Sequence, residues 1–291
     1  MVVAAYRRHF DVALDDGERL RCVLKGRSAQ IACGDHVNIA RAAGGGSIES
    51  VLPRASTLYR SDAHQGKLIA ANVTQIVGIV APDLSLDEEL INRWMIAAEA
   101  EGCRFVLAAN KADLPSFATL RARLAPYAAL GYRVVELVAL RDVAPIVPSL
   151  AQQRTVLVGQ SGMGKSTLVN TLCPQAQIRT QDVSAALATG RHTTTSTTLY
   201  QIPVLGADSW VVDSPGIKAF GLAHLAPERI AESFVELRPL LGRCRFRDCR
   251  HGLEPGCVVQ SAVAAGAVAP FRVALLHSLI AEASYARGAV W

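Results

Sequence analysis

A glycine-rich sequence of eight residues constrains the fold of this chain more than any other segment. It fits G-x-x-x-x-G-K-[ST] in full and consists of Gly159, Gln160, Ser161, Gly162, Met163, Gly164, Lys165 and Ser166. An apolar strand pattern at 155–158 precedes it and helical spacing begins at Thr167, which is the context in which this motif binds phosphate. The alternative is a glycine-rich turn that binds nothing. We therefore predict a phosphate loop (residues 159–166) within an α/β domain.

The chemistry of the phosphate loop assigns a role to its last residues. Its glycines let backbone N–H groups turn towards phosphate oxygens, and the helix N-terminus adds its positive end. Lys165 is expected to reach the β- and γ-phosphates and to act in catalysis, and the Ser166 hydroxyl is expected to bind Mg²⁺. Thr167, the next residue of the helix, completes the predicted phosphate-binding set.

A second motif predicts which base the site accepts. Asn110, Lys111, Ala112 and Asp113 follow an apolar strand pattern at 105–109, at the strand end where open α/β sheets bind ligands. The Asp113 carboxylate can accept hydrogen bonds from N1–H and N2–H₂ of guanine, whereas adenine lacks this donor pair. Asn110 can tie this base-recognition loop (residues 110–113) to the phosphate loop, and the Lys111 stem can lie over the base. The nucleotide is therefore predicted to be GTP.

Two further segments have the sequences of nucleotide-sensing switches. Asp213 ends a strand pattern and is expected to hold Mg²⁺, while the Gly216 N–H can bind the γ-phosphate. Ile217 stands where many GTPases have a glutamine that orients the attacking water, and isoleucine cannot do this. In the polar segment 190–197, Thr193 and Thr194 are the candidates for completing the Mg²⁺ shell. His192 is the candidate for positioning water, and its alternative role is that of an ordinary surface histidine.

The order of these motifs indicates a circular permutation. The base-recognition loop precedes the phosphate loop, which precedes Asp213, whereas a conventional GTPase begins with its phosphate loop. Because the termini of compact domains often lie close together, such a permutation preserves the sheet. Strands are predicted at 75–80, 105–109, 155–158, 199–204 and 210–212, with helices at 86–101, 120–130 and 165–172. This alternation is typical of a mostly parallel sheet covered by helices.

The flanking segments predict two further domains. Residues 1–71 combine short strand patterns with turn signals, which favours an all-β barrel of the OB type. Residues 72–222 form the predicted GTPase domain, and residues 223–291 are mostly helical by pattern. The last domain contains C-x₄-C-x-H-x₅-C, whose Cys244, Cys249, His251 and Cys257 suit one closed, structural zinc site. A disulfide is the alternative. Arginines interleave with these four residues and suggest an RNA contact.

Composition narrows the remaining classes of protein. Hydrophobic residues make up 51% of 291, which excludes disorder as the main state, and the net charge of +5 is compatible with a polyanionic partner. The chain contains no uninterrupted apolar run of about 18 residues, and residues 1–10 lack the apolar region of a secretory leader. We therefore expect a cytoplasmic monomer that does not bind membranes.

Taken together, these motifs resemble a known family, the circularly permuted bacterial GTPases of the RsgA type that act in small-ribosomal-subunit biogenesis. The resemblance covers nearly the whole chain and is carried by Gly34-Asp35, Leu52-Pro53-Arg54, Ala71-Asn72-Val73, residues 110–114, 159–167, 190–195, 213–216 and 244–257. It implies an OB barrel, a permuted GTPase domain and a zinc domain. It also implies GTP hydrolysis stimulated by the small (30S) subunit late in its maturation, followed by release from the subunit.

Two positions depart from the family pattern. Thr74 stands where an aspartate is usual, and Val138-Ala139 replaces the usual Ser-Ala of the fifth guanine motif. A backbone N–H of that segment is still expected to meet guanine O6, with a modest loss of affinity. The hypothesis is thus a GTPase that binds GTP, GDP and the rRNA of the 30S subunit. The alternatives are an RNA-binding assembly factor with GTP as a structural ligand, and a P-loop kinase or ATPase.

Overall fold

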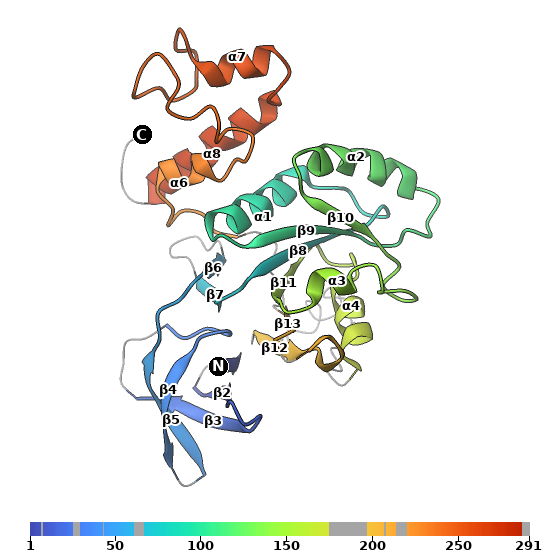
Figure 1. Ribbon diagram of the computed structural model, residues 1–291, viewed down its shortest axis with the longest axis vertical. Helices are drawn as coiled ribbons and strands as arrows, with labels where there is room; N and C mark the ends of the chain where they lie inside the picture. The colour runs from blue at the N-terminus through green and yellow to red at the C-terminus, as the bar shows by residue number, and fades with distance from the viewer. Residues whose placement is uncertain are drawn as a thin grey trace, which may run out of the picture.

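A computed structural model describes the following residues of the chain: 1–6, 8–25, 30–42, 44–60, 67–174, 197–206, 208–213 and 220–286 (Figure 1). Five parallel strands form the centre of its main sheet in the order β10-β9-β8-β11-β13. Their bounds are β8 (Gln75–Val80), β9 (Arg104–Ala109), β10 (Arg133–Glu136), β11 (Arg154–Val158) and β13 (Trp210–Asp213). The predicted parallel sheet is confirmed, and β8, β9, β11 and β13 lie within a residue or two of the expected positions, whereas the sequence patterns predicted no strand at β10.

Helices cover both faces of this sheet, with α1 and α2 above it and α3 and α4 below it in Figure 1. They are α1 (Glu88–Ala100), α2 (Phe117–Ala129), α3 (Val147–Leu150) and α4 (Lys165–Leu172). Helix α1 begins where the Asp87 side chain accepts a hydrogen bond from the Leu90 N–H. Its buried Trp94 packs on Gly78 of β8, where an added Cβ would lie 2.9 Å from the indole ring. Because Gly78 has no side chain, α1 can pack closely against the sheet at this point.

One strand prediction at the sheet edge was too long. The predicted strand 199–204 is β12 (Thr198–Gln201) followed by the 3-10 helix η2 (Pro203–Leu205). Pro203 lacks the N–H that a strand ladder needs, so the strand ends before it. β12 runs antiparallel to β13.

The N-terminal strands continue the same sheet beyond β12. They are β1 (Val2–Ala5), β2 (Phe10–Ala13), β3 (Arg19–Leu24), β4 (Val37–Ala42) and β5 (Gly45–Val51), in the order β1-β2-β3-β5-β4 with β3 parallel to β5. β1 pairs with β12 through Ala4 and Thr198. Val2, Val12, Cys22 and Ile48 form a small core separate from the main one. A hairpin of β6 (Thr57–Arg60) and β7 (Lys67–Ala71) leads into β8.

Three short motifs that are far apart in the sequence meet where these strands join the main sheet. Asp35 is fully buried, and its carboxylate accepts bonds of 2.7 and 2.8 Å from the Arg54 guanidinium. The Asn72 side chain donates to the Gly34 carbonyl at 2.9 Å. An added Cβ on Gly34, whose φ is +91°, would lie 1.9 Å from the Ala71 carbonyl oxygen. The Gly-Asp, Leu-Pro-Arg and Ala-Asn-Val motifs therefore build one junction.

Thr74, the first departure from the family pattern, keeps a polar role at this junction. Its hydroxyl donates to Gln153 Oε1 at 2.8 Å and accepts from the Arg154 N–H at 2.9 Å. The Thr74 hydroxyl thus accepts the hydrogen bond from the first N–H of β11, so an aspartate carboxylate is not needed at this position.

Three C-terminal helices lie at the opposite end of the molecule from β2–β5 (Figure 1), and the first and last of them contact α1. They are α6 (Pro227–Glu232), α7 (Val258–Ala264) and α8 (Pro270–Ala286). The buried Arg272 of α8 pairs with Glu236 at 2.5 Å and donates to the Asn92 side chain of α1. Arg93 of α1 pairs with Glu282 at 2.9 Å. Among the described residues, no helix has both the length and the apolar character needed to span a membrane.

Candidate nucleotide site and cysteine–histidine cluster

The phosphate loop connects β11 to α4, as its sequence predicts. Gly164 precedes α4 with a φ of +101°, and an added Cβ would lie 2.2 Å from the Asn110 side-chain nitrogen. Glycine is therefore required there both by the backbone conformation and by the close neighbour. The Lys165 ammonium bends back over the loop and donates to the carbonyls of Gly159 at 2.5 Å and Gln160 at 2.8 Å. The Lys165 cation thus lies against the loop that is predicted to bind the phosphates.

The buried Asn110 side chain links the three loops at this edge of the sheet. Its amide nitrogen donates to the Met163 carbonyl of the phosphate loop at 2.9 Å. Its amide oxygen accepts from the Ala139 N–H, also at 2.9 Å. The predicted tie between the base-recognition loop and the phosphate loop is therefore present. The Ala139 N–H is committed to Asn110, so this particular group does not supply the donor to guanine O6 that we expected from residues 138–139.

The remaining side chains of the base-recognition loop form ion pairs with neighbouring loops. Lys111 has a φ of +61°, and its ammonium pairs with Asp83. The Asp113 carboxylate is partly exposed, with Arg141 at 3.5 Å. Sequence reasoning missed both Asp83 and Arg141. Asp83 comes shortly after the buried strand β8, so its place at the ligand-binding edge was a usable signal.

The two switch segments are described only in part. Asp213 is the last residue of β13, which pairs in parallel with β11, so its backbone ends next to the strand that leads into the phosphate loop. Gly216 and Ile217 lie outside the described residues. So do His192, Thr193 and Thr194, the candidates for positioning water and binding Mg²⁺.

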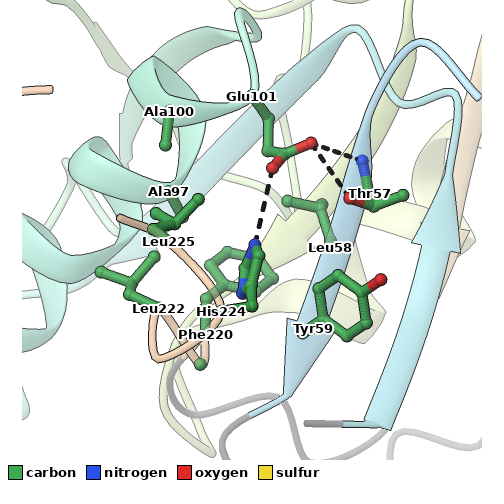
Figure 2. A pocket seen from close by; sticks show the side chains of 11 residues that line it. Thr57, Leu58, Tyr59, Ala97, Ala100, Glu101, Phe220, Leu222, His224 and Leu225 are labelled. Atoms are coloured by element: carbon green, nitrogen blue, oxygen red, sulfur yellow. Dashed lines mark hydrogen bonds and ion pairs between the residues drawn. The ribbon is translucent and has the colours of Figure 1, made fainter. Parts of the chain in front are cut away.

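Residues 220–225, which follow the switch segment that begins at Asp213, pack between the β6–β7 hairpin and α1 (Figure 2). The Gly221 N–H donates to the Tyr59 carbonyl at 2.9 Å. The ring of His224 contacts that of Tyr59 at a tilt of 48°, and its Nε2 lies 3.7 Å from a Glu101 carboxylate oxygen. The cavity that these residues line has a volume of about 10 Å³. That is room for about one water molecule, so this cavity cannot hold a nucleotide.

Glu101 is held as a carboxylate in this cavity. Burial alone would raise the pKa of Glu101, but the neighbouring His224 and the hydrogen bond from the Thr57 N–H outweigh it and lower the pKa below its ordinary value. The Thr57 N–H donates to Glu101 Oε2 at 2.6 Å. The carboxylate therefore stabilises the contact between the hairpin, α1 and residues 220–225.

The Cys244, Cys249, His251 and Cys257 side chains converge as their spacing predicts. Their four ligand atoms lie within 4.8 Å of one another. His251 Nδ1 is 3.5 Å from the sulfur of Cys244, 3.7 Å from that of Cys249 and 3.6 Å from that of Cys257. Burial lowers the pKa of His251 and so favours its neutral, ligating form. This arrangement can hold a metal ion.

Exposed arginines surround the cluster. They are Arg243, Arg245, Arg247 and Arg250. Phe246 lies among them with 43% of its surface exposed, and the Arg245 guanidinium is 5.5 Å from the centre of its ring. The C-terminal region thus presents a basic surface with an exposed aromatic ring.

The permuted motif order, the parallel sheet and the converging loops define a circularly permuted GTPase. Two solved structures share this fold across nearly the whole chain. The crystal structure of YjeQ from Thermotoga maritima has a TM-score of 0.73 and 27% identity, with 97% of each chain covered. That of YloQ, described as a circularly permuted GTPase, has a TM-score of 0.70 and 24% identity, with 98% of this chain and 94% of that chain covered.

The chain belongs to the RsgA GTPase family, whose model matches residues 51–223. A relative from Nitrosospira multiformis is 47% identical, covering 97% of this chain and 90% of its own length. One from Burkholderia pseudomallei is 46% identical, with 97% and 91% covered. Both are named small ribosomal subunit biogenesis GTPase RsgA. The resemblance inferred from the motifs is therefore confirmed.

Replacing Glu101 with glutamine tests the contact in Figure 2. Because the folded-state pKa of Glu101 is lowered, its stabilising effect is complete above the unfolded-state pKa of about 4.5 and declines as pH falls through the lower folded value. Wild type should thus exceed Glu101→Gln in unfolding free energy at pH 7, and the gap should narrow below about pH 4.5. Urea unfolding between pH 7 and pH 3.5 measures this gap. A gap that is constant with pH would contradict the assignment.

Proposed function

We propose that this protein is a GTPase that acts in late maturation of the small (30S) ribosomal subunit, binds its rRNA and leaves after hydrolysing GTP to GDP. The observation that carries the proposal is Asn110, which joins the base-recognition loop to the phosphate loop at one sheet edge. The names of the relatives supply the biological setting. A P-loop kinase or ATPase has no use for the Asp113 carboxylate at this place.

In the proposed complex, the nucleotide lies across the three loops that Asn110 connects. Asp113 selects guanine, with Lys111 and Ala112 beside it, and the backbone of residues 159–164 surrounds the phosphates. Lys165 contacts the β- and γ-phosphates and Thr167 continues the contact at the start of α4. Ser166 and Asp213 hold Mg²⁺, which supplies charge neutralisation at the β- and γ-phosphates when bound. Gly216 binds the γ-phosphate until it is released.

Orientation of the hydrolytic water is the step for which this chain lacks the glutamine that many GTPases use. Ile217 offers no polar group to orient it, so we assign that role to His192, with Thr193 or Thr194 completing the Mg²⁺ shell. Bound rRNA then orders the segment that carries these residues. Hydrolysis frees the switch segment 213–216, and the tethered C-terminal domain loosens its hold on the subunit. The subunit thereby controls when its own assembly factor turns over.

Two flanking domains would hold the rRNA. We assign residues 1–71 to a barrel of the OB type, residues 72–222 to the GTPase domain and residues 223–291 to the C-terminal domain. The strand order β1-β2-β3-β5-β4 and the separate small core support the barrel assignment. Backbone bonds also join β1 to the segment that precedes β4, from the Val2 N–H to the Asp35 carbonyl and from the Gly34 N–H to the Val2 carbonyl, each at 2.8 Å. We expect the protein to work as a cytoplasmic monomer, not at a membrane.

Zinc is the metal that the cysteine–histidine cluster fits best. Zinc bonds of about 2.3 Å to sulfur and 2.0–2.1 Å to nitrogen place tetrahedral ligands about 3.5 Å apart for S···N and about 3.8 Å apart for S···S. The three S···N distances of 3.5–3.7 Å and the Cys244–Cys257 distance of 3.9 Å agree with these values. With four protein ligands, the site would be closed and structural.

GTP turnover with and without purified 30S subunits tests the function. If the subunit supplies or orders one catalytic group, turnover should rise by about 100-fold or more. The stimulation should fall steeply across a salt series, because rRNA binding depends on phosphate contacts. Equal turnover with and without subunits would overturn the proposal that the subunit controls hydrolysis. Single-turnover phosphate release with bound subunits distinguishes a GTPase from an assembly factor for which GTP is a structural ligand.

Asp113→Asn tests the choice of guanine. The asparagine amide can accept from the xanthine N1–H and donate to its O2. With guanine, the NH₂ of the amide would face the N2–H₂ donor, so only one hydrogen bond could form, and preference should shift from GDP to xanthosine diphosphate. We expect GDP affinity to fall by about 100-fold, because one hydrogen bond to a charged group, contributing about 1.5–3 kcal/mol, is lost. Calorimetry with GDP, XDP and ADP measures all three affinities. Equal binding of ADP and GDP by wild type would overturn the assignment of the base.

Cys249→Ser tests the zinc ligands. Wild type should contain about one zinc per chain, and the variant should retain much less after dialysis against a mild chelator, because serine is a poor zinc ligand. Elemental analysis by mass spectrometry gives the stoichiometry. Cys103→Ser is the matched control, since Cys103 is a buried thiol far from the cluster in sequence and is expected to leave the zinc content unchanged. Undiminished zinc in Cys249→Ser would refute this ligand set.

A further inference from the structure

The contact between Asp83 and Lys111 lies beside the predicted base position. We propose that Asp83 is a positioning residue: its carboxylate holds the Lys111 ammonium so that the lysine stem is already in place to cover the purine when a guanine nucleotide binds. The inference rests on the proposed function, because it concerns the same nucleotide site. It adds a specificity-supporting residue from a loop outside the nucleotide motifs.

The loop that carries Asp83 is fixed at both ends. β8 ends at Val80, whose carbonyl accepts the Asn110 N–H at 2.8 Å. At its other end, the Asp87 side chain caps α1 through the Leu90 N–H at 3.1 Å. Asp83 therefore extends from a short connection anchored to the same backbone that carries Lys111.

The same loop also touches the phosphate loop. A methyl carbon of Leu84 lies 3.4 Å from the position of an added Cβ on Gly162. β8 runs between β9, which leads to Lys111, and β11, which leads to Gly162. The Asp83–Leu84 turn is thus placed to contact both the base-recognition loop and the phosphate loop. Its position relative to these loops is fixed because β8 is hydrogen-bonded to β9 and to β11.

Lys111 needs such a partner because its own chain is flexible. A lysine side chain loses up to about 2 kcal/mol of conformational freedom when it is ordered. The backbone of Lys111 is already fixed in a left-handed conformation, because the N–H of Asn110 bonds to Val80 of β8 and that of Ala112 to Leu137, which follows β10. Pairing the ammonium with Asp83 restricts the side chain before the ligand arrives, and preorganisation of this kind improves affinity.

The second ion pair of the base-recognition loop, between Arg141 and Asp113, cannot preorganise the site in the same way. Arg141 faces the Asp113 carboxylate that guanine itself must engage, and its side chain is 76% exposed. Asp83 and Lys111 are 40% and 30% exposed, and neither carboxylate oxygen of Asp83 is needed by the base. The Asp83–Lys111 pair can therefore persist in the complex, whereas the Arg141–Asp113 pair must share its carboxylate with the ligand.

A double-mutant cycle on GDP affinity tests the proposal. Asp83→Asn removes the charge, and Lys111→Met removes the ammonium while keeping an unbranched apolar stem. Since partly exposed ion pairs contribute about 0.2–1 kcal/mol, Asp83→Asn should weaken GDP binding by about 1.4- to fivefold in the wild-type background. It should have no further effect on top of Lys111→Met. Fluorescent GDP dissociation, measured by stopped flow, resolves changes of this size.

Asp87→Asn is the matched control. It removes the same charge from the same loop, and asparagine caps a helix as well as aspartate does, so GDP dissociation should not change. A general loss of folding would weaken GDP binding equally in both Lys111 backgrounds and would overturn the proposal. So would unchanged dissociation from Asp83→Asn. If wild type itself fails to prefer GDP over ADP, the proposed function fails instead, so the two failures are distinguishable.

Discussion

The Asn110 side chain is the contact on which the rest of the nucleotide site depends. One amide group satisfies the Met163 carbonyl and the Ala139 N–H, so three loops from three strands are held by a single buried residue. Removing the amide would leave a buried donor and a buried acceptor without partners. The close approach of Gly164 to the same side chain shows that the start of α4 is fitted to it. Base recognition and phosphate binding are therefore one structural unit, although 53 residues separate Asn110 from Met163.

Much of this unit could be predicted because its chemistry is local. The phosphate loop, the base-recognition loop and the cysteine–histidine cluster each depend on a few residues at fixed spacing, and their strands and helices have clear periodicity. The contacts that sequence reasoning missed join distant segments. Nothing local marks Asp83 as the partner of Lys111, or Arg141 as that of Asp113. Nothing local shows that the Ala139 N–H, one of the two candidate donors to guanine O6 in residues 138–139, is bonded to Asn110, which is 29 residues away.

Helix α1 contacts two regions that the domain division keeps apart. Its N-terminus follows the Asp83–Leu84 turn at the nucleotide site. Its side chains also bond to Arg272 and Glu282 of α8 and to Arg238 of the segment between α6 and α7. Residues 220–225, which follow the second switch, pack on its last turn beside Glu101. The C-terminal region is thus connected to the nucleotide site along the chain and also through a rigid helix.

The pairing of β1 with β12 has a consequence for how the chain tolerates shortening. Thr197, the residue before β12, receives hydrogen bonds from the Ala5 N–H at 3.4 Å and the Cys33 thiol at 2.9 Å. Without the first strands, β12 would become an exposed edge strand of the central sheet, with unpaired amides and carbonyls facing water. Because exposed edge strands pair with extended segments of other chains, the N-terminal strands also protect the enzyme against self-association.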